Sequence, residues 1–194
     1  MIKLIIGISG ASGVVIAIEL LKKLKQIENI ETHLVITESA ALNFQYETDF
    51  NICDIKKMVN FTYDIHDISA SIASGSFITN GMIVVPCSMK TVAGIASGYA
   101  ENLLLRAADV CIKENRKIVV VPREMPLNRI HLRNLKELAD NGVIIIPPLL
   151  TFYNKYSTIQ QQIDHIVGKI LMQFNLPSSI PEWTSNMNYK IKII

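Results

Sequence analysis

The sequence contains few cysteines and histidines. Its three cysteines, Cys53, Cys87 and Cys111, are too few and too scattered to predict a disulfide framework or a zinc site. The four histidines show no metal-ligand spacing either. We therefore expect no protein-bound metal, and a chain that works in a reducing compartment, the cytoplasm.

Long hydrophobic runs, basic runs and a leader pattern are also missing. No stretch reaches the roughly 18 consecutive apolar residues of a membrane-spanning helix. The formal net charge is only +2, and no basic residues interleave with aromatics, so nucleic acid is not an expected partner. The N-terminal stretch MIKLIIGISG lacks a charged n-region and a long h-region, which argues against a signal peptide.

Apolar residues are abundant instead. They make up 49% of the 194 residues, and the mean hydropathy is +0.30. A parallel sheet covered on both faces produces such a composition, because its strands are apolar all round. A buried subunit interface would add to it, and we expect a homo-oligomer as well.

Apolar strand patterns alternate with helical patterns along the chain. Strands are expected at residues 2–8, 31–37, 80–88, 117–122 and 143–148, with a weaker one near 61–65. Helices are expected at residues 14–27, 38–48, 90–98, 101–115, 127–142 and 158–174. This alternation predicts an α/β fold with a parallel sheet and helices on both faces. We expect one domain over residues 1–176 and a tail over 177–194 that packs on a neighbouring subunit.

Ligands of such sheets bind beyond the carboxyl ends of the strands. The expected strand ends are residues 7–13, 37–39, 86–91, 123–126 and 147–153. They are far apart in the sequence, and we expect them to converge in space.

The first strand end reads GISGASG, residues 7–13. The dinucleotide fingerprint is G-x-G-x-x-G with an acid about twenty residues further on. Ser9 replaces its second glycine, and Glu38 is a candidate ribose acid, so NAD fits imperfectly. Ser12, beside backbone N–H groups at a helix start, suits a monophosphate or the edge of a flavin. A tight turn with a serine cap and no ligand is the alternative.

The stretch PCSMKT, residues 86–91, is a second strand-to-helix turn. Ser88 is a candidate N-cap. Lys90 in the first helical turn opposes the helix dipole unless an anion lies nearby; otherwise it is a solvated lysine. Cys87 is either an activated thiolate or a small buried residue.

A polar stripe follows on residues 101–115, where Asn102, Arg106, Asp109 and Lys113 share one helical face. It is either a solvated face with Arg106–Asp109 and Asp109–Lys113 ion pairs, or a basic wall that binds phosphate across a subunit contact.

The stretch VPREMP places Arg123 and Glu124 between two prolines at a strand end. They form either a surface ion pair or an anion-binding arginine with an acid/base partner. Tyr153 and Lys169 have no assignment from their local sequence alone.

Several stretches together resemble one family. They are GISGASG, PCSMKTVAGIASG, NLLLRAADVCIKE, VPREMPLNRIHLRNLKELADNGVIIIP and FY, which span nearly the whole chain in order. They resemble the UbiX-like flavin prenyltransferases, a family once described as aromatic acid decarboxylases. The resemblance implies a three-layer αβα, flavodoxin-like Rossmann sandwich assembled as a dodecamer. It also implies FMN, dimethylallyl phosphate as a metal-independent donor, and a UbiD-type decarboxylase that receives the prenylated FMN.

The resemblance also implies roles for individual residues. Flavin contacts fall on Gly10, Ala11, Ser12, Thr37, Ser88, Met89, Lys90, Thr91 and Arg123. The reacting centre takes Glu47, Glu124 and Ser12, and the donor phosphate takes Arg106, Lys113, Tyr153 and Lys169. The family often has arginine at the position of Lys169, and a lysine keeps the charge but loses the bidentate fork.

The implied reaction is attack of reduced flavin nitrogen-5 on the allylic carbon as phosphate leaves, followed by ring closure at carbon-6. Cationic and hydroxyl donors would stabilise the leaving group, and Glu124 or the released phosphate would move protons. The alternatives are an NAD-dependent oxidoreductase, a non-enzymatic FMN carrier, and a decarboxylase subunit acting on aromatic acids.

Overall fold

The computed structural model describes residues 1–178 and 180. Within them, six parallel strands form one sheet in the order β3-β2-β1-β4-β5-β6. The order reverses between β1 and β4, which is the switch point of doubly wound folds. The expected α/β sandwich with a parallel sheet is confirmed.

The strands are β1 (Ile2–Ile8), β2 (Ile30–Ile36), β3 (Phe61–Tyr63), β4 (Gly81–Cys87), β5 (Lys117–Pro122) and β6 (Ile144–Ile145). The helices are α1 (Val14–Lys25), α2 (Glu38–Glu47), α3 (Ile52–Lys56), α4 (Met89–Ala96), α5 (Leu103–Lys113), α6 (Arg129–Asp140) and α7 (Ile159–Gln173), with a 3₁₀ turn at Ser71–Ala73.

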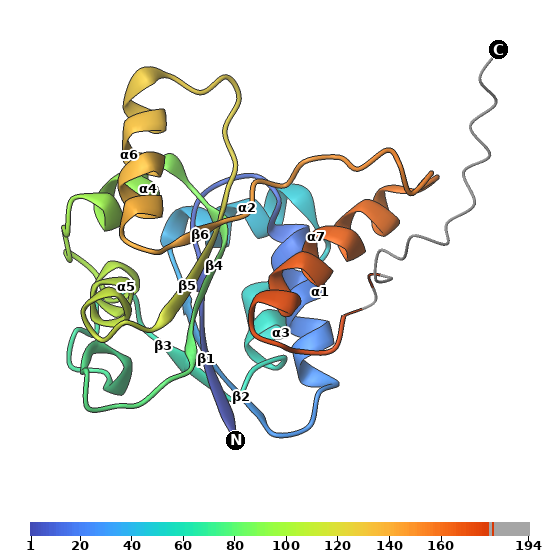
Figure 1. Ribbon diagram of the computed structural model, residues 1–194. Coiled ribbons are helices and arrows are strands. Elements are labelled where there is room, and N and C mark those ends of the chain that lie inside the picture. Colours follow the sequence, from blue (N-terminus) through green and yellow to red (C-terminus); the bar gives the residue numbers. More distant parts are fainter. Residues whose placement is uncertain (179, 181–194) are drawn as a thin grey trace, which may run out of the picture.

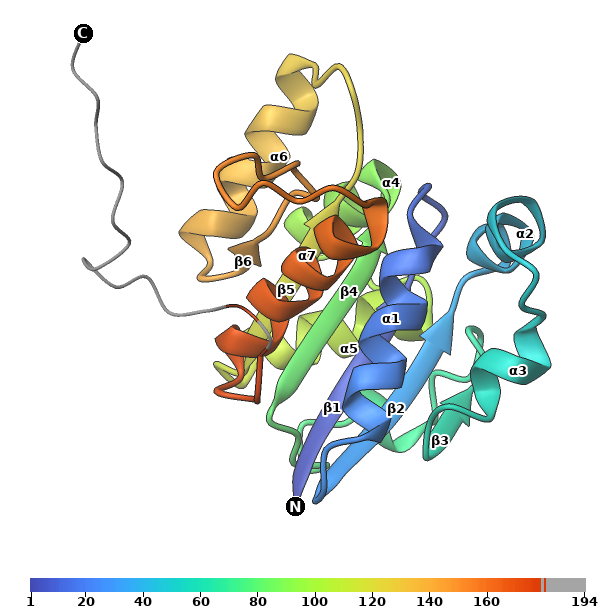
Figure 2. The same cartoon turned by 90° about the vertical axis from the view of Figure 1, so that its right-hand side faces the viewer.

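Helices cover both faces of the sheet, as Figures 1 and 2 show. Helices α1 and α7 lie on one face, and α4 and α5 lie on the other. All seven residues of β4 are buried, because this central strand is covered on both sides. Two apolar clusters, one on each face, form the core.

Four expectations about the elements are corrected. Helix α3 was not expected; Asn51 and Asp54 form a capping box that starts it. The expected strand at 143–148 is reduced to Ile144–Ile145, since Pro147 and Pro148 have no N–H to donate to a sheet.

Two helices begin later than expected, after asparagine N-caps. Asn102 accepts a hydrogen bond from the Leu105 N–H, so α5 begins at 103 and not at 101. Asn128 caps α6 in the same way through the His131 N–H, so α6 begins at 129 and not at 127. Apart from 177, 178 and 180, the expected tail at 177–194 lies outside the described residues.

Within the described residues, every helix is too short or too polar to cross a bilayer. In that same part of the chain, no three histidine, cysteine or acidic side chains gather closely enough to hold a metal ion. The three cysteines are free thiols.

Candidate functional site

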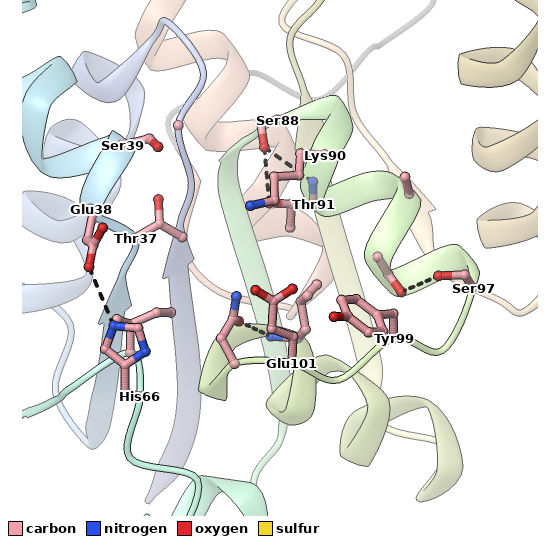
Figure 3. Close-up of a pocket in the computed structure, with 16 residues that line it drawn as sticks. Thr37, Glu38, Ser39, His66, Ser88, Lys90, Thr91, Ser97, Tyr99 and Glu101 are labelled. Carbon is pink, nitrogen blue, oxygen red and sulfur yellow. Dashed lines mark hydrogen bonds and ion pairs between the residues drawn. The ribbon is translucent and has the colours of Figure 1, made fainter.

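A cavity of about 520 Å³ opens beyond the carboxyl ends of β1, β2 and β4, beside the switch point (Figure 3). Three of the five expected strand ends contribute to it through Gly10, the segment 37–39 and the turn after β4. The segments 123–126 and 147–153 do not line it. Five of the residues assigned to the flavin do line it: Gly10, Thr37, Ser88, Lys90 and Thr91.

Two helix N-termini face the cavity. Thr37 caps α2, with its hydroxyl oxygen 3.2 Å from the Ala40 nitrogen. Ser88 caps α4, with its Oγ 3.3 Å from the Thr91 nitrogen and 3.0 Å from the Thr91 hydroxyl. Helix N-termini carry partial positive charge and free N–H groups, so this wall suits an anion.

Lys90 strengthens that preference. Its exposed side chain is the only lysine or arginine among the described residues that line the cavity. It lies in the first turn of α4, where a cation is unfavourable in the absence of an anion. Met89, also assigned to the flavin, is the first residue of this helix; it is buried and does not line the cavity.

Ser9 joins the loops that follow β1 and β4. Its buried Oγ accepts from the Ser88 N–H at 2.8 Å and donates to the Pro86 carbonyl at 3.1 Å. Ser9, which replaces the second glycine of the fingerprint, therefore links the loop after β1 to the loop after β4. Gly10 is required beside it, because a Cβ there would lie 2.4 Å from the Ser39 Cβ.

The N-terminus of α1 is already occupied by a carboxylate of the protein. Glu47 Oε2, at the end of α2, accepts from the Gly13 N–H at 2.8 Å and the Val14 N–H at 3.1 Å. Gly13 is the N-cap with φ 107° and provides no side-chain bond, so the alternative of a serine-capped turn is wrong. Ser12 is exposed and Ala11 buried, and neither lines the cavity.

The cavity rim carries further polar groups, of which only Glu38, the candidate ribose acid, was assigned to a ligand. Glu38 and His66 lie next to each other on it, with 3.4 Å between Glu38 Oε1 and His66 Nε2 (Figure 3). Tyr99 and Glu101 lie at the opposite side. His66 and Glu101 come from loops without a recognisable motif, and only the topology brings them to the site.

The turn after β5 lies next to the β4 loop but outside the cavity lining. Arg123 is exposed, and its backbone N–H donates to the Cys87 carbonyl at 3.2 Å. Glu124 is exposed as well, and its Oε1 accepts from the Met125 N–H at 3.0 Å. Cys87 itself is fully buried, and burial raises the pKa of its thiol far above the usual range, which contradicts a thiolate nucleophile.

The four residues assigned to the donor phosphate form two separate pairs. Arg106 and Lys113 lie on α5, and Tyr153 and Lys169 lie around α7, on the other face of the sheet (Figure 1). One chain therefore does not gather all four.

Arg106 and Lys113 of α5 each pair with an acid close by in the sequence. Arg106 Nη1 lies 2.6 Å from Asp109 Oδ2, and its Nε donates to the Ala73 carbonyl at 3.2 Å. Lys113 pairs with Glu114 at 2.5 Å, so the alternative Asp109–Lys113 pair is wrong. Asn102 is the N-cap of this helix and not a member of its polar face.

Comparisons with known proteins agree with this geometry. The model of the flavoprotein family matches residues 1–175. A probable UbiX-like flavin prenyltransferase of Sedimentibacter hydroxybenzoicus is 63% identical over 174 residues, covering 90% of this chain and 92% of the relative. The flavin prenyltransferase LpdB of Lactiplantibacillus plantarum is 49% identical, covering 90% and 93%.

Two solved structures share the fold closely. One is a dodecameric FMN-dependent UbiX-like decarboxylase of Escherichia coli O157:H7, with a TM-score of 0.92, 44% identity and coverage of 94% of this chain and all of that one. The other is AnUbiX (PadA1) in complex with FMN and dimethylallyl pyrophosphate, with a TM-score of 0.91, 41% identity and coverage of 94% and 97%.

Proposed function

The chain belongs to the UbiX-like flavin prenyltransferases within the flavoprotein family, and from this we propose that it transfers a dimethylallyl group from dimethylallyl phosphate to reduced FMN. The product is prenylated FMN, for use by a UbiD-type decarboxylase. The observation that carries the proposal is the cavity at the switch point, which two capped helix N-termini and Lys90 line together.

The flavin phosphate is expected at the N-termini of α2 and α4. Thr37, Ser88 and Thr91 provide hydroxyl groups there, and Lys90 provides the countercharge. When bound, the reduced flavin supplies the nucleophilic nitrogen and the ring carbon that receive the dimethylallyl group. Arg123 and Glu124, on the turn beside the β4 loop, remain the proposed flavin ligand and proton-transfer group.

A dinucleotide fits this site less well. The pyrophosphate of NAD binds the first helix of such folds through its N-terminal N–H groups. Here the Gly13 and Val14 N–H groups already donate to Glu47, and a second anion would be repelled by that carboxylate. Glu38, the candidate ribose acid, is paired with His66.

We also propose that the enzyme is a homo-oligomer, of dodecameric size by family. Arg106 and Lys113 lie on one face of the sheet and Tyr153 and Lys169 on the other, so copies must meet to gather one donor site. Large apolar side chains are exposed on the loop after β5, on α6 and on the loop after β6: Met125, Leu127, Ile130, Leu132, Leu149, Leu150 and Phe152. Exposed apolar side chains in such number mark protein interfaces.

The test is anaerobic incubation with reduced FMN and dimethylallyl monophosphate, followed by mass spectrometry of the flavin. We expect the flavin to gain the mass of one prenyl group, with and without a metal chelator. A parallel sample with the diphosphate shows which donor is used. Bound FMN without a mass change from either donor would favour a flavin carrier, and NAD-linked redox turnover would favour an oxidoreductase.

A further inference from the structure

A chain of two hydrogen bonds ends on a histidine of α7. The Asn154 side-chain NH₂ donates to the Tyr156 hydroxyl oxygen at 2.9 Å, and that hydroxyl lies 3.2 Å from His165 Nδ1. The amide nitrogen can only donate, so the tyrosine hydrogen remains available to the histidine. When the hydroxyl donates it to Nδ1, the ring proton of a neutral His165 sits on Nε2, and we take this tautomer as part of the proposal below.

The environment of His165 keeps the ring neutral. Only 7% of the residue is exposed, and burial, with the nearby Lys169 ammonium, lowers its pKa from the usual value. In the described part of the chain, Nε2 takes part in no hydrogen bond, while every fully buried side-chain nitrogen there has a partner. Nε2 is therefore not fully enclosed, and it is an unused donor when it carries the ring proton.

That donor lies among residues already assigned to an anion. Lys169 follows His165 by one helical turn, so both project from the same side of α7. The Tyr153 ring meets the His165 ring edge-on, with centroids 6.5 Å apart and an interplanar angle of 84°. Lys169 supplies one flexible point charge, whereas arginine would supply two fixed donors.

We propose that His165 binds the phosphate of the prenyl donor through Nε2–H, and that His165 and Lys169 together replace the two donors of a single arginine. The inference rests on the proposed function, since it deepens the assignment of Tyr153 and Lys169 to that phosphate. Tyr156 and Asn154 act as positioning residues, because they hold the tautomer that places the proton on Nε2.

The test is calorimetric titration of inorganic phosphate into the FMN-loaded oligomer, so that the flavin site is filled and only the donor site is measured. His165→Phe keeps a ring against Tyr153 but removes the donor, and we expect it to weaken phosphate binding by about tenfold or more. His165→Gln retains an N–H and should stay within about threefold of the unsubstituted protein. Gln160→Ala, an exposed position on the same helix, is the matched control and should change nothing.

Tyr156→Phe tests whether the tyrosine hydroxyl orients His165 or whether the ring only packs against it. It leaves the imidazole in place but removes the hydroxyl that selects its tautomer, and we expect an intermediate loss of phosphate affinity with unchanged FMN content. The same ranking should appear in the KM for dimethylallyl phosphate while FMN affinity stays constant.

Two results would overturn the inference: phosphate binding that His165→Phe leaves intact although Lys169→Met abolishes it, or no phosphate binding by the unsubstituted oligomer. The calorimetric readout does not depend on prenyl transfer. Phosphate binding with the expected ranking but no prenylated flavin would reject the proposed function and leave the site standing. If His165→Phe loses its FMN, the phosphate affinities of His165→Gln and Tyr156→Phe still test the inference.

Discussion

Glu47 caps the helix that follows the glycine-rich loop, with its Oε2 2.8 Å from the Gly13 nitrogen. The same oxygen accepts from the next N–H, of Val14, at 3.1 Å. The protein thus fills with its own carboxylate the position at which a dinucleotide fold holds pyrophosphate. This is why we propose the N-termini of α2 and α4 for the ligand phosphate.

We expect Glu47→Ala to lower the free energy of unfolding by about 1–2 kcal/mol, the size of a lost N-cap with its dipole interaction. Glu47→Gln should cost about half as much, because its carbonyl oxygen still accepts while the charge is lost. Urea denaturation of the FMN-free protein measures both. Glu28→Ala, at an exposed position, is the control; a Glu47→Ala value equal to that of the control would show that the carboxylate does not cap α1.

The contact between Glu47 and the Gly13 N–H could not be predicted from the sequence. Residues 13 and 47 are separated by 34 positions, and no local pattern links them. Ser9 was likewise interpreted as a missing glycine, because its bonds to Pro86 and Ser88 cross 77 and 79 positions. Contacts of this kind depend on the packed sheet and not on local propensity.

The strands were easier to predict from the sequence than these long-range contacts. Apolar runs located β1, β4 and β5, because strands buried on both faces are apolar throughout. The last strand was overestimated, since an apolar run continues where prolines already end the hydrogen bonding. Five strand ends were predicted to converge; those after β1, β2 and β4 line one cavity, whereas residues 123–126 and 147–153 do not line it.

Replacing Lys90 should have opposite effects on stability and on FMN affinity. In the FMN-free protein, Lys90→Met should raise the free energy of unfolding by about 0.3–1 kcal/mol, because a cation in the first turn of α4 opposes the dipole. FMN affinity should fall by about tenfold, since a charge-assisted contact with the phosphate is lost.

Flavin fluorescence quenching measures the affinity, and thermal unfolding measures the stability. Lys56→Met, an exposed lysine on α3, should leave FMN affinity unchanged. Equal FMN affinities for Lys90→Met and the unsubstituted protein would mean that this lysine is a solvated surface group and nothing more.

Glu124 is expected to act in proton transfer and not in flavin binding. Glu124→Gln keeps an oxygen for the Met125 N–H, so the turn should hold its shape and FMN should stay bound. Ring closure should slow by about a hundredfold, the usual size of a lost acid/base group. Stopped-flow spectroscopy of anaerobic prenylation follows that step, with Glu137→Gln on α6 as the control; unchanged turnover would remove Glu124 from the chemistry.

His33 should make the protein less stable in mild acid. The side chain is buried, with Nδ1 2.9 Å from the Tyr63 hydroxyl and Nε2 2.9 Å from Glu31 Oε1. Burial lowers its pKa below the usual 6.5, Lys3 adds to this, and Glu31 opposes it only in part.

A lowered histidine pKa means that the unfolded chain takes up more protons than the folded one as the pH falls through about 6.5 and below. The free energy of unfolding should therefore fall over that range and level off below the pKa of the folded state. His165, whose pKa burial also lowers, adds a contribution of the same sign. Urea denaturation at pH 7.5 and 5.5 tests this: His33→Gln should show a smaller loss of stability between the two pH values than the unsubstituted protein, and an equal loss would show that His33 carries no part of the pH dependence.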